Sequence, residues 1–151
     1  MEIMKTSQLA VAIFVLCCCC STALFAEDEK DTRNPVDKYH GDAFFYSLTC
    51  KLSFQIAMSK RQLSQPSDEK DDYRACITKG KTASKQNLDA ALKTVKKPNA
   101  KEALKTYHVA LVSALEGINP GSDERKINYE QRQQNLEGKM TEAWARFEIE
   151  Q

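Results

Sequence analysis

The sequence has few residues of the kinds that form tight turns, and it has almost no net charge. Its 151 residues include five glycines and four prolines, and the formal net charge is +1 at pH 7. So few turn-forming residues argue against an all-β fold. The near balance of 22 basic and 21 acidic residues argues against a nucleic-acid-binding chain and against a highly charged disordered one. At this length we expect one domain.

The sequence has six cysteines, but four of them are consecutive, Cys17–Cys20. They fall within residues 9–26, a segment without any charged side chain that follows Lys5 and precedes an acidic stretch. A charged start, an apolar centre and small residues before a charged segment are typical of a secretory signal peptide. We therefore expect a periplasmic or secreted protein, with residues 1–26 as its signal peptide.

The exact cleavage site and the fate of this segment leave alternatives open. Cleavage after Ala26 leaves a charged start, whereas cleavage after Ala23 has the better pattern of small residues. An uncharged run of about 18 residues also meets the lower limit for an uncleaved membrane anchor. A lipid-modified cysteine is the least favoured alternative, because Cys17 follows a leucine rather than a small residue. We expect no stable membrane anchor, and we expect residues 27–33 to form a flexible leader.

Cleavage leaves two cysteines, Cys50 and Cys76. In an exported protein, two remaining cysteines are expected to pair in a disulfide. The closed loop of about 25 residues predicts roughly 3 kcal/mol of stabilisation from reduced unfolded-state entropy. The two residues lie at unequal distances from Pro66, in the break between the first two predicted helices. The pairing therefore requires either an early end to the first helix or a long connection.

The first predicted helix begins with Asn34 as its N-cap and Pro35 at its first position, and it extends to about Arg61. Apolar and small residues at steps of three and four predict its buried face. They are Val36, Tyr39, Ala43, Ser47, Cys50, Phe54 and Ala57, and we expect Phe45, Leu48, Leu52 and Ile56 to widen that face.

A second helix is expected to be capped by Ser67 or Asp68 and to be stopped by Pro98. Asn99 and Glu102 have the spacing of a capping box, which predicts the start of a third helix. The third helix ends near residues 117–121 and has the most regular apolar stripe of the chain. That stripe consists of Ala100, Ala103, Leu104, Tyr107, Leu111, Ala114, Leu115 and Ile118.

Ser122 is expected to cap a fourth helix, in which Ile127 and Tyr129 are the only apolar anchors of the first half. No strand pattern competes with these four helices. Four helices joined by short connections predict an all-α protein, namely an antiparallel up-down four-helix bundle over residues 34–151 with one disulfide.

No pattern in the sequence predicts a catalytic, cofactor-binding or metal site. Residues 75–82 match a relaxed phosphate-binding loop, but such a loop needs a preceding strand, so we expect Gly80 to serve close helix packing instead. His40 and His108 lack the further ligands of a metal centre, and we expect ordinary surface or boundary histidines. We expect no enzyme activity and no cofactor.

Three groups of side chains are candidate binding surfaces. The stretch from Thr78 to Lys105 is rich in lysine, which favours either a solvated helix face or a docking surface for an acidic partner. Three consecutive helical residues, Phe44 to Tyr46, cannot all face one core. The first half of the last helix is polar. The candidate residues are Lys79, Lys81, Lys85, Phe44, Tyr46, Arg125, Tyr129 and Arg132.

Two segments resemble a known family. The sequence Cys76-Ile77-Thr78-Lys79-Gly80, followed by Leu88 to Leu92, is similar to the opening helix of small periplasmic lysozyme-inhibitor (LprI-like) helical domains. The stretch from Leu136 to Phe147, with Ala143-Trp144, resembles the closing helix of that family. The resemblance implies an exported helical protein that acts by binding.

We therefore expect an exported helical binding protein without catalytic activity, which acts as an inhibitor or immunity factor for an envelope-targeting enzyme. Its partner is expected to be a protein, and nucleic acid is not expected. The alternative is a structural or stress-related envelope protein whose lysine-rich helix face contacts an anionic cell-wall polymer.

Overall fold

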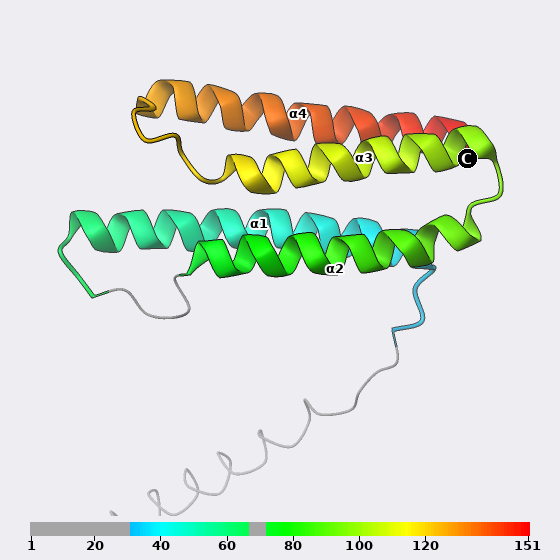
Figure 1. Cartoon of the computed structure of the whole chain (residues 1–151), viewed down its shortest axis with the longest axis horizontal. Helices are drawn as coiled ribbons and strands as arrows, with labels where there is room; N and C mark the ends of the chain where they lie inside the picture. Colours follow the sequence, from blue (N-terminus) through cyan, green and yellow to red (C-terminus); the bar gives the residue numbers. More distant parts are fainter. Residues whose placement is uncertain (1–30, 67–71) are drawn as a thin grey trace, which may run out of the picture. The chain divides into compact units, whose positions relative to one another are not determined.

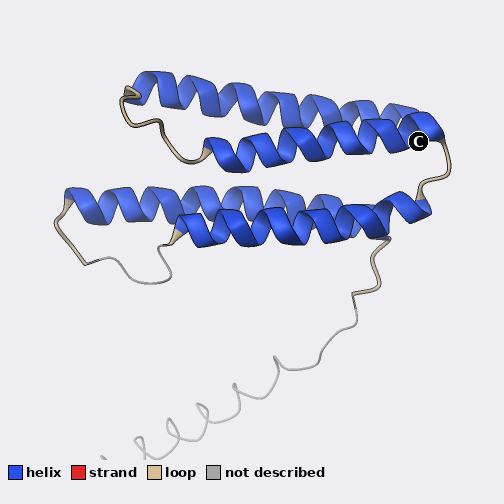
Figure 2. Cartoon of the chain, viewed as in Figure 1, coloured by secondary structure: helices blue, strands red, loops and turns tan. Residues whose placement is uncertain are grey.

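Four α-helices make up the regular structure in a computed structural model that describes residues 31–66 and 72–151 (Figures 1 and 2). In these ranges no strand occurs. Residues Arg33–Gln151 form one compact unit. The all-α prediction with four helices is confirmed, and the helices are α1 (Pro35–Gln62), α2 (Tyr73–Thr94), α3 (Pro98–Gly117) and α4 (Lys126–Glu150).

The helices of this unit pack mainly in two pairs. In Figure 1, α1 lies along α2 and α3 lies along α4, and further contacts join α2 and α1 to α3. None of the described helices is long and apolar enough to cross a membrane. The predicted signal peptide of residues 1–26 and most of the leader lie outside the described residues.

The start of α1 follows the prediction. The side-chain oxygen of Asn34 accepts a hydrogen bond of 3.0 Å from the backbone N–H of Val36, and Pro35 occupies the first helical position. Proline fits there because that position has no intrahelical acceptor for a backbone N–H. The last turn carries Lys60 and Arg61, whose charges suit the negative end of the helix dipole.

The start of α2 and the start of α3 both differ from the prediction. Ser67 and Asp68 lie outside the described residues, and α2 is capped by Asp72, whose carboxylate accepts from two backbone N–H groups. The prediction of a capping box at Asn99 is wrong, because α3 begins one residue earlier, with Pro98 at its first position. Lys97 is extended, as expected for the residue before a proline.

The start of α4 is also later than predicted. Ser122 does not cap the helix, because α4 begins at Lys126 after an extended Arg125. The connection from α3 is held instead by Glu124, whose carboxylate accepts a 3.1 Å hydrogen bond from the N–H of Gly121. Ile127 is 66% exposed and therefore does not anchor this half of α4 to the core.

The core is centred on α3. All eight residues of its predicted apolar stripe are buried, which confirms that face of the helix. Facing side chains of α1, α2 and α4 complete the core. The largest fully buried side chains are Tyr39, Tyr107 and Phe147. The apolar periodicity of α3 is unambiguous because its remaining faces are largely polar.

Only one of the two apolar faces of α1 is buried. Val36, Tyr39, Ala43, Cys50 and Phe54 face the core as predicted. The residues that were expected to widen this face are instead exposed, so that part of the prediction is wrong. Their exposed fractions are 60% for Phe45, 48% for Leu48, and 47% for both Leu52 and Ile56.

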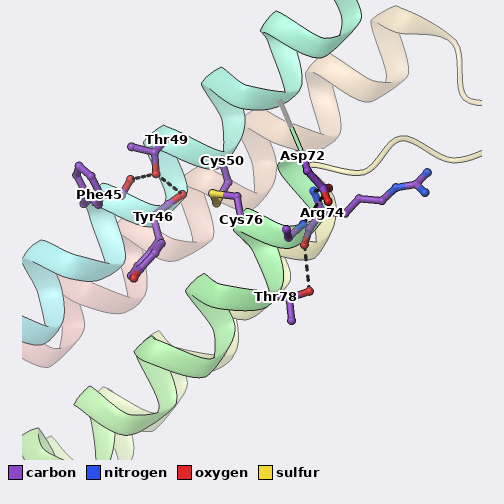
Figure 3. Close-up of a disulfide and its surroundings, with 9 residues drawn as sticks. Phe45, Tyr46, Thr49, Cys50, Asp72, Arg74, Cys76 and Thr78 are labelled. Carbon is purple, nitrogen blue, oxygen red and sulfur yellow. Dashed lines mark hydrogen bonds between the residues drawn. A yellow bond between two sulfur atoms is a disulfide. The ribbon is translucent and has the colours of Figure 1, made fainter. Parts of the chain in front are cut away.

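A disulfide joins Cys50 of α1 to Cys76 of α2, which confirms the predicted pair (Figure 3). Their Cα atoms are 5.5 Å apart, within the usual range for a disulfide. The unequal spacing is accommodated by a long connection between Gln62 and Tyr73, while α1 continues well past the bridge. Figure 1 accordingly shows α1 extending beyond the start of α2.

Near the disulfide, α1 and α2 approach closely because Gly80 has no side chain. A Cβ atom at Gly80 would lie 3.2 Å from the ring of Tyr46, tighter than most contacts of this kind. Gly80 therefore serves close packing, as the sequence predicts. Tyr46 is half-buried in this contact, whereas Phe44 and Phe45 are 59% and 60% exposed.

Candidate functional site

Two adjoining hollows, which share Lys51, lie between α1 and α4, and we call them together the groove. Its first part, which we call the aromatic half, has a volume of about 430 Å³, within the range typical of ligand pockets. Apolar and aromatic side chains of α1 and α4 dominate its walls. The lining residues are His40, Phe44, Ser47, Leu48, Lys51, Tyr107, Glu137, Met140, Thr141 and Trp144.

The second part of the same groove, the polar half, has a volume of about 760 Å³. Glutamines and charged side chains line most of it, together with Phe54, Met58 and Tyr129. An ion pair between Lys51 of α1 and Glu137 of α4 crosses the groove at the boundary between the two halves. The groove thus offers apolar walls on one side of a charged pair and polar walls on the other.

The floor of the aromatic half rests on two tyrosine–histidine pairs that join α1 to α3. The hydroxyl of Tyr39 lies 2.9 Å from Nδ1 of His108, and Nδ1 of His40 lies 3.0 Å from the hydroxyl of Tyr107. The two tyrosine rings meet edge to face, with centroids 5.7 Å apart. Each helix therefore supplies one tyrosine and one histidine to a reciprocal arrangement that fixes α1 against α3.

Trp144 of α4 forms one wall of the aromatic half. Its ring stacks on His40 with centroids 3.7 Å apart and planes inclined by 13°. It also contacts the rings of Tyr107 and Phe147 at centroid distances of 5.1 and 5.0 Å. These contacts place the only tryptophan of the chain at the groove, where it is half-buried.

Burial favours the neutral forms of the four residues in the two tyrosine–histidine pairs, Tyr39, His40, Tyr107 and His108. It lowers the pKa of His40 below 6.5, an effect that the carboxylates of Glu148 and Asp37 oppose. It also lowers the pKa of His108, and it raises the pKa of both Tyr39 and Tyr107 above 10. Neutral partners suit the two hydrogen-bonded pairs near neutral pH.

We expect the free energy of unfolding to fall as the pH is lowered from 7.5 to 5.5. Because the pKa of His40 and of His108 is lowered in the folded state, the unfolded chain binds more protons just below pH 6.5. Urea unfolding at the two pH values measures this change. In the double variant His40→Gln and His108→Gln the dependence should flatten, and an equally steep dependence there would contradict the assignment.

Two of the predicted surface residues stabilise the end of α3. Arg132 donates to both carboxylate oxygens of Glu124, at 2.8 and 2.7 Å, and to the carbonyl of Gly117 at 2.7 Å. This ion pair is the main reason that the pKa of Glu124 falls to about 2. The hydroxyl of Tyr129 donates to the carbonyl of Ile118, while the Tyr129 ring lines the polar half of the groove.

The other predicted surface residues are spread over three helices. Phe44 lines the aromatic half of the groove, and Arg125 is exposed at the start of α4. Lys79 and Lys85 are exposed on α2, but Lys81, between them, forms an ion pair with Glu116 of α3. The structure therefore does not bring the candidate residues together in one site.

Sequence reasoning missed the two tyrosine–histidine pairs under the groove and, at the end of α3, the buried Gln133. The dipeptide Tyr-His occurs twice, at 39–40 and 107–108, and this repetition was the available signal for the paired arrangement. Gln133 is buried and donates to the carbonyl of Gly117, although its sequence context suggests an exposed position. The apolar spacing of α4 does not predict a buried glutamine, because the burial of Gln133 depends on a carbonyl at the end of another helix that has no partner within that helix.

The groove has the composition of a binding surface. In the parts of the chain that the structure describes, no three histidine, cysteine or acidic residues are grouped so as to hold a metal ion. Comparison with known proteins identified no matching family model, no matching curated protein and no matching solved structure.

Proposed function

We propose that this chain is an exported helical binding protein without catalytic activity, which holds a segment of a partner protein in the α1–α4 groove. The observation that carries the proposal is the aromatic half of that groove, where Phe44, Leu48, Met140 and Trp144 present apolar surface. Trp144 is held in position by its contact with His40, so little ordering is needed when a ligand binds.

The chemistry of the groove favours an amphipathic segment as the ligand. Exposed apolar walls suit aliphatic or aromatic anchors, and Met140 adapts readily to different shapes. The Lys51–Glu137 pair supplies one hydrogen-bonding and charged position beside those anchors. A helix or extended strand with two or three apolar anchors and a neighbouring polar group meets these requirements.

We propose further that the partner is an envelope-targeting enzyme, with this chain as its inhibitor or immunity factor. The charged start, apolar centre and small residues of segment 1–26 support export, and the Cys50–Cys76 disulfide is compatible with an oxidising compartment. The resemblance to the LprI-like family favours the same class of function. An antiparallel up-down order of the helices belongs to this proposal and is supported by the pairing of α1 with α2 and of α3 with α4.

The alternative function is contact with an anionic cell-wall polymer through the lysines of α2. The exposed side chains of Lys79 and Lys85 support it. The ion pair of Lys81 with Glu116 reduces the free positive charge of that face. Binding through this face would weaken steeply with added salt and on reversal of the lysine charges, whereas groove binding would not.

The proposal predicts that Thr141→Arg abolishes capture of the partner by the exported protein used as bait on an envelope fraction. Thr141 is exposed and lines the aromatic half, so an arginine there fills the groove without removing a core contact. Thr82→Arg is the matched control. Like Thr141, Thr82 is exposed and donates to the carbonyl four residues earlier, but it lies on α2, outside the groove.

Capture of one protein by the wild type and by Thr82→Arg, but not by Thr141→Arg, is the expected result. Equal capture by all three baits would contradict a role for the groove. Retention of wall polymer instead, lost at high salt, would favour the lysine face of α2.

A further inference from the structure

The outer face of α1, opposite the disulfide-bearing face, presents a continuous row of exposed apolar side chains. We call this the outer row, and it consists of Phe45, Leu48, Leu52 and Ile56 of α1 together with Leu63 directly after its end, with exposed fractions from 47% to 68%. The steps along it are three or four residues, with Ser59 between Ile56 and Leu63. Such spacing keeps the row on one side of a straight helix. The only charged residue between Phe45 and Ser59 is Lys51, which lies more than a quarter turn away from Leu52 and therefore off the row.

The outer row is distinct from the α1–α4 groove. The groove uses the flank of α1 that carries His40, Phe44 and Lys51, about a quarter turn or more away from the centre of the row. Of the five apolar residues of the row, only Leu48 lines the groove, in its aromatic half, and Ser59, between Ile56 and Leu63, lines the polar half. A partner seated on the outer row therefore leaves most of the groove accessible.

The size of the outer row approaches that of a protein interface. Five large apolar side chains that are about half exposed present on the order of 500 Å². This is at the upper end of the largest apolar patch on a typical monomer, about 300–600 Å². With the polar atoms around it, it approaches the roughly 800 Å² per partner of a standard interface.

The sequence along the row is self-complementary about Leu52. A two-fold axis at Leu52 places Leu48 of one copy opposite Ile56 of the second, because each is four residues from the axis. The same axis places Phe45 opposite Ser59, a large side chain against a small one. Two copies of α1 crossing in opposite directions would therefore interlock along the row.

Charge adds little to this contact. Asp42, on the flank of α1 beside the row, is already paired within its own copy with Arg33 and Lys38, at 3.5 and 3.7 Å, and it accepts a 2.8 Å hydrogen bond from Asn87 of α2. We therefore expect the contact between two copies to be chiefly apolar.

From these observations we infer that α1 mediates a symmetric homodimer, in which the outer rows of two copies pack against each other around Leu52. This inference goes beyond the proposed function and does not depend on it. It gives an assembly with two α1–α4 grooves, one in each copy.

The test is sedimentation velocity of the chain from Glu27, which contains the complete Arg33–Gln151 unit. The expected result is a concentration-dependent dimer with weak salt dependence. Leu52→Glu should raise the dimer dissociation constant at least about a hundredfold, because it places two carboxylates at the axis. Gln86→Glu, an exposed change on α2, should leave the constant unchanged.

Crosslinking tests whether Leu52 of the two copies meets at the axis, and it does so even if Leu52→Glu disturbs the fold. With the native cysteines paired, Leu52→Cys should give dimers with a short bifunctional thiol reagent, and Gln86→Cys should not. A wild type that stays monomeric at every concentration would overturn the inference. So would a dimer that persists in a folded Leu52→Glu variant, or a monomer that instead binds lipid vesicles through the outer row.

Discussion

Replacing Cys50 and Cys76 together with alanine is expected to lower the free energy of unfolding by about 3–4 kcal/mol. The disulfide closes a loop of 26 residues in sequence, and its loss restores conformational freedom to that loop in the unfolded chain. The loss is large beside the roughly 5–15 kcal/mol of total stability of a typical domain. Urea unfolding of the wild type and of the double variant measures the difference.

Chemical reduction provides the control for this prediction. A reductant should destabilise the wild type by a similar amount and should leave the double alanine variant unchanged. Cys50 is fully buried, so alanine is preferred to serine, which would introduce an unpaired hydroxyl in the core. A double variant as stable as the oxidised wild type would show that the bridge does not stabilise the fold.

Phe44→Ala is expected to weaken binding of the captured partner by roughly 10-fold to 100-fold. Phe44 is 59% exposed and lines the aromatic half, so a ligand in the groove would bury its ring. We expect an effect of this size because burying one phenyl ring contributes about 1.5–3 kcal/mol to the free energy of binding. Isothermal titration of the purified partner into each variant gives the ratio of dissociation constants.

The neighbouring residue Phe45 offers a closely matched control. It is 60% exposed on the same helix, but it belongs to the outer row and does not line the groove. Phe45→Ala should leave partner binding unchanged and should weaken the α1-mediated dimer instead. Equal loss of partner affinity in both variants would indicate that the partner binds the outer face of α1 rather than the groove.

The fold could be predicted to the level of helices and their buried faces where one face alone is apolar. The stripe of α3 met that condition, and the caps at Asn34 and Pro35 fixed the start of α1. α1 itself has two apolar faces with the same helical spacing, and spacing alone does not tell which one meets the core. Pro98 was ambiguous for a similar reason, because proline both stops one helix and suits the first turn of the next.

The groove could not be predicted because it depends on how far α4 stands from α1. Its walls come from residues about a hundred positions apart, such as Phe44 and Trp144, and no local pattern relates them. The reciprocal Tyr39–His108 and His40–Tyr107 pairs likewise require the register between α1 and α3. Arg132 was placed correctly on α4, but its bonds to Gly117 and Glu124 arise from the tertiary fold.

The emission of Trp144 on addition of the captured partner tests the central proposal most directly, because this residue is the only tryptophan of the chain and lines the groove. With a partner segment free of tryptophan, the proposal predicts a saturable blue shift in the wild type and in Thr82→Arg, as bound ligand excludes water from the ring. It predicts no such shift in Thr141→Arg. A complex that forms in all three proteins without changing the emission of Trp144 would contradict binding in the α1–α4 groove.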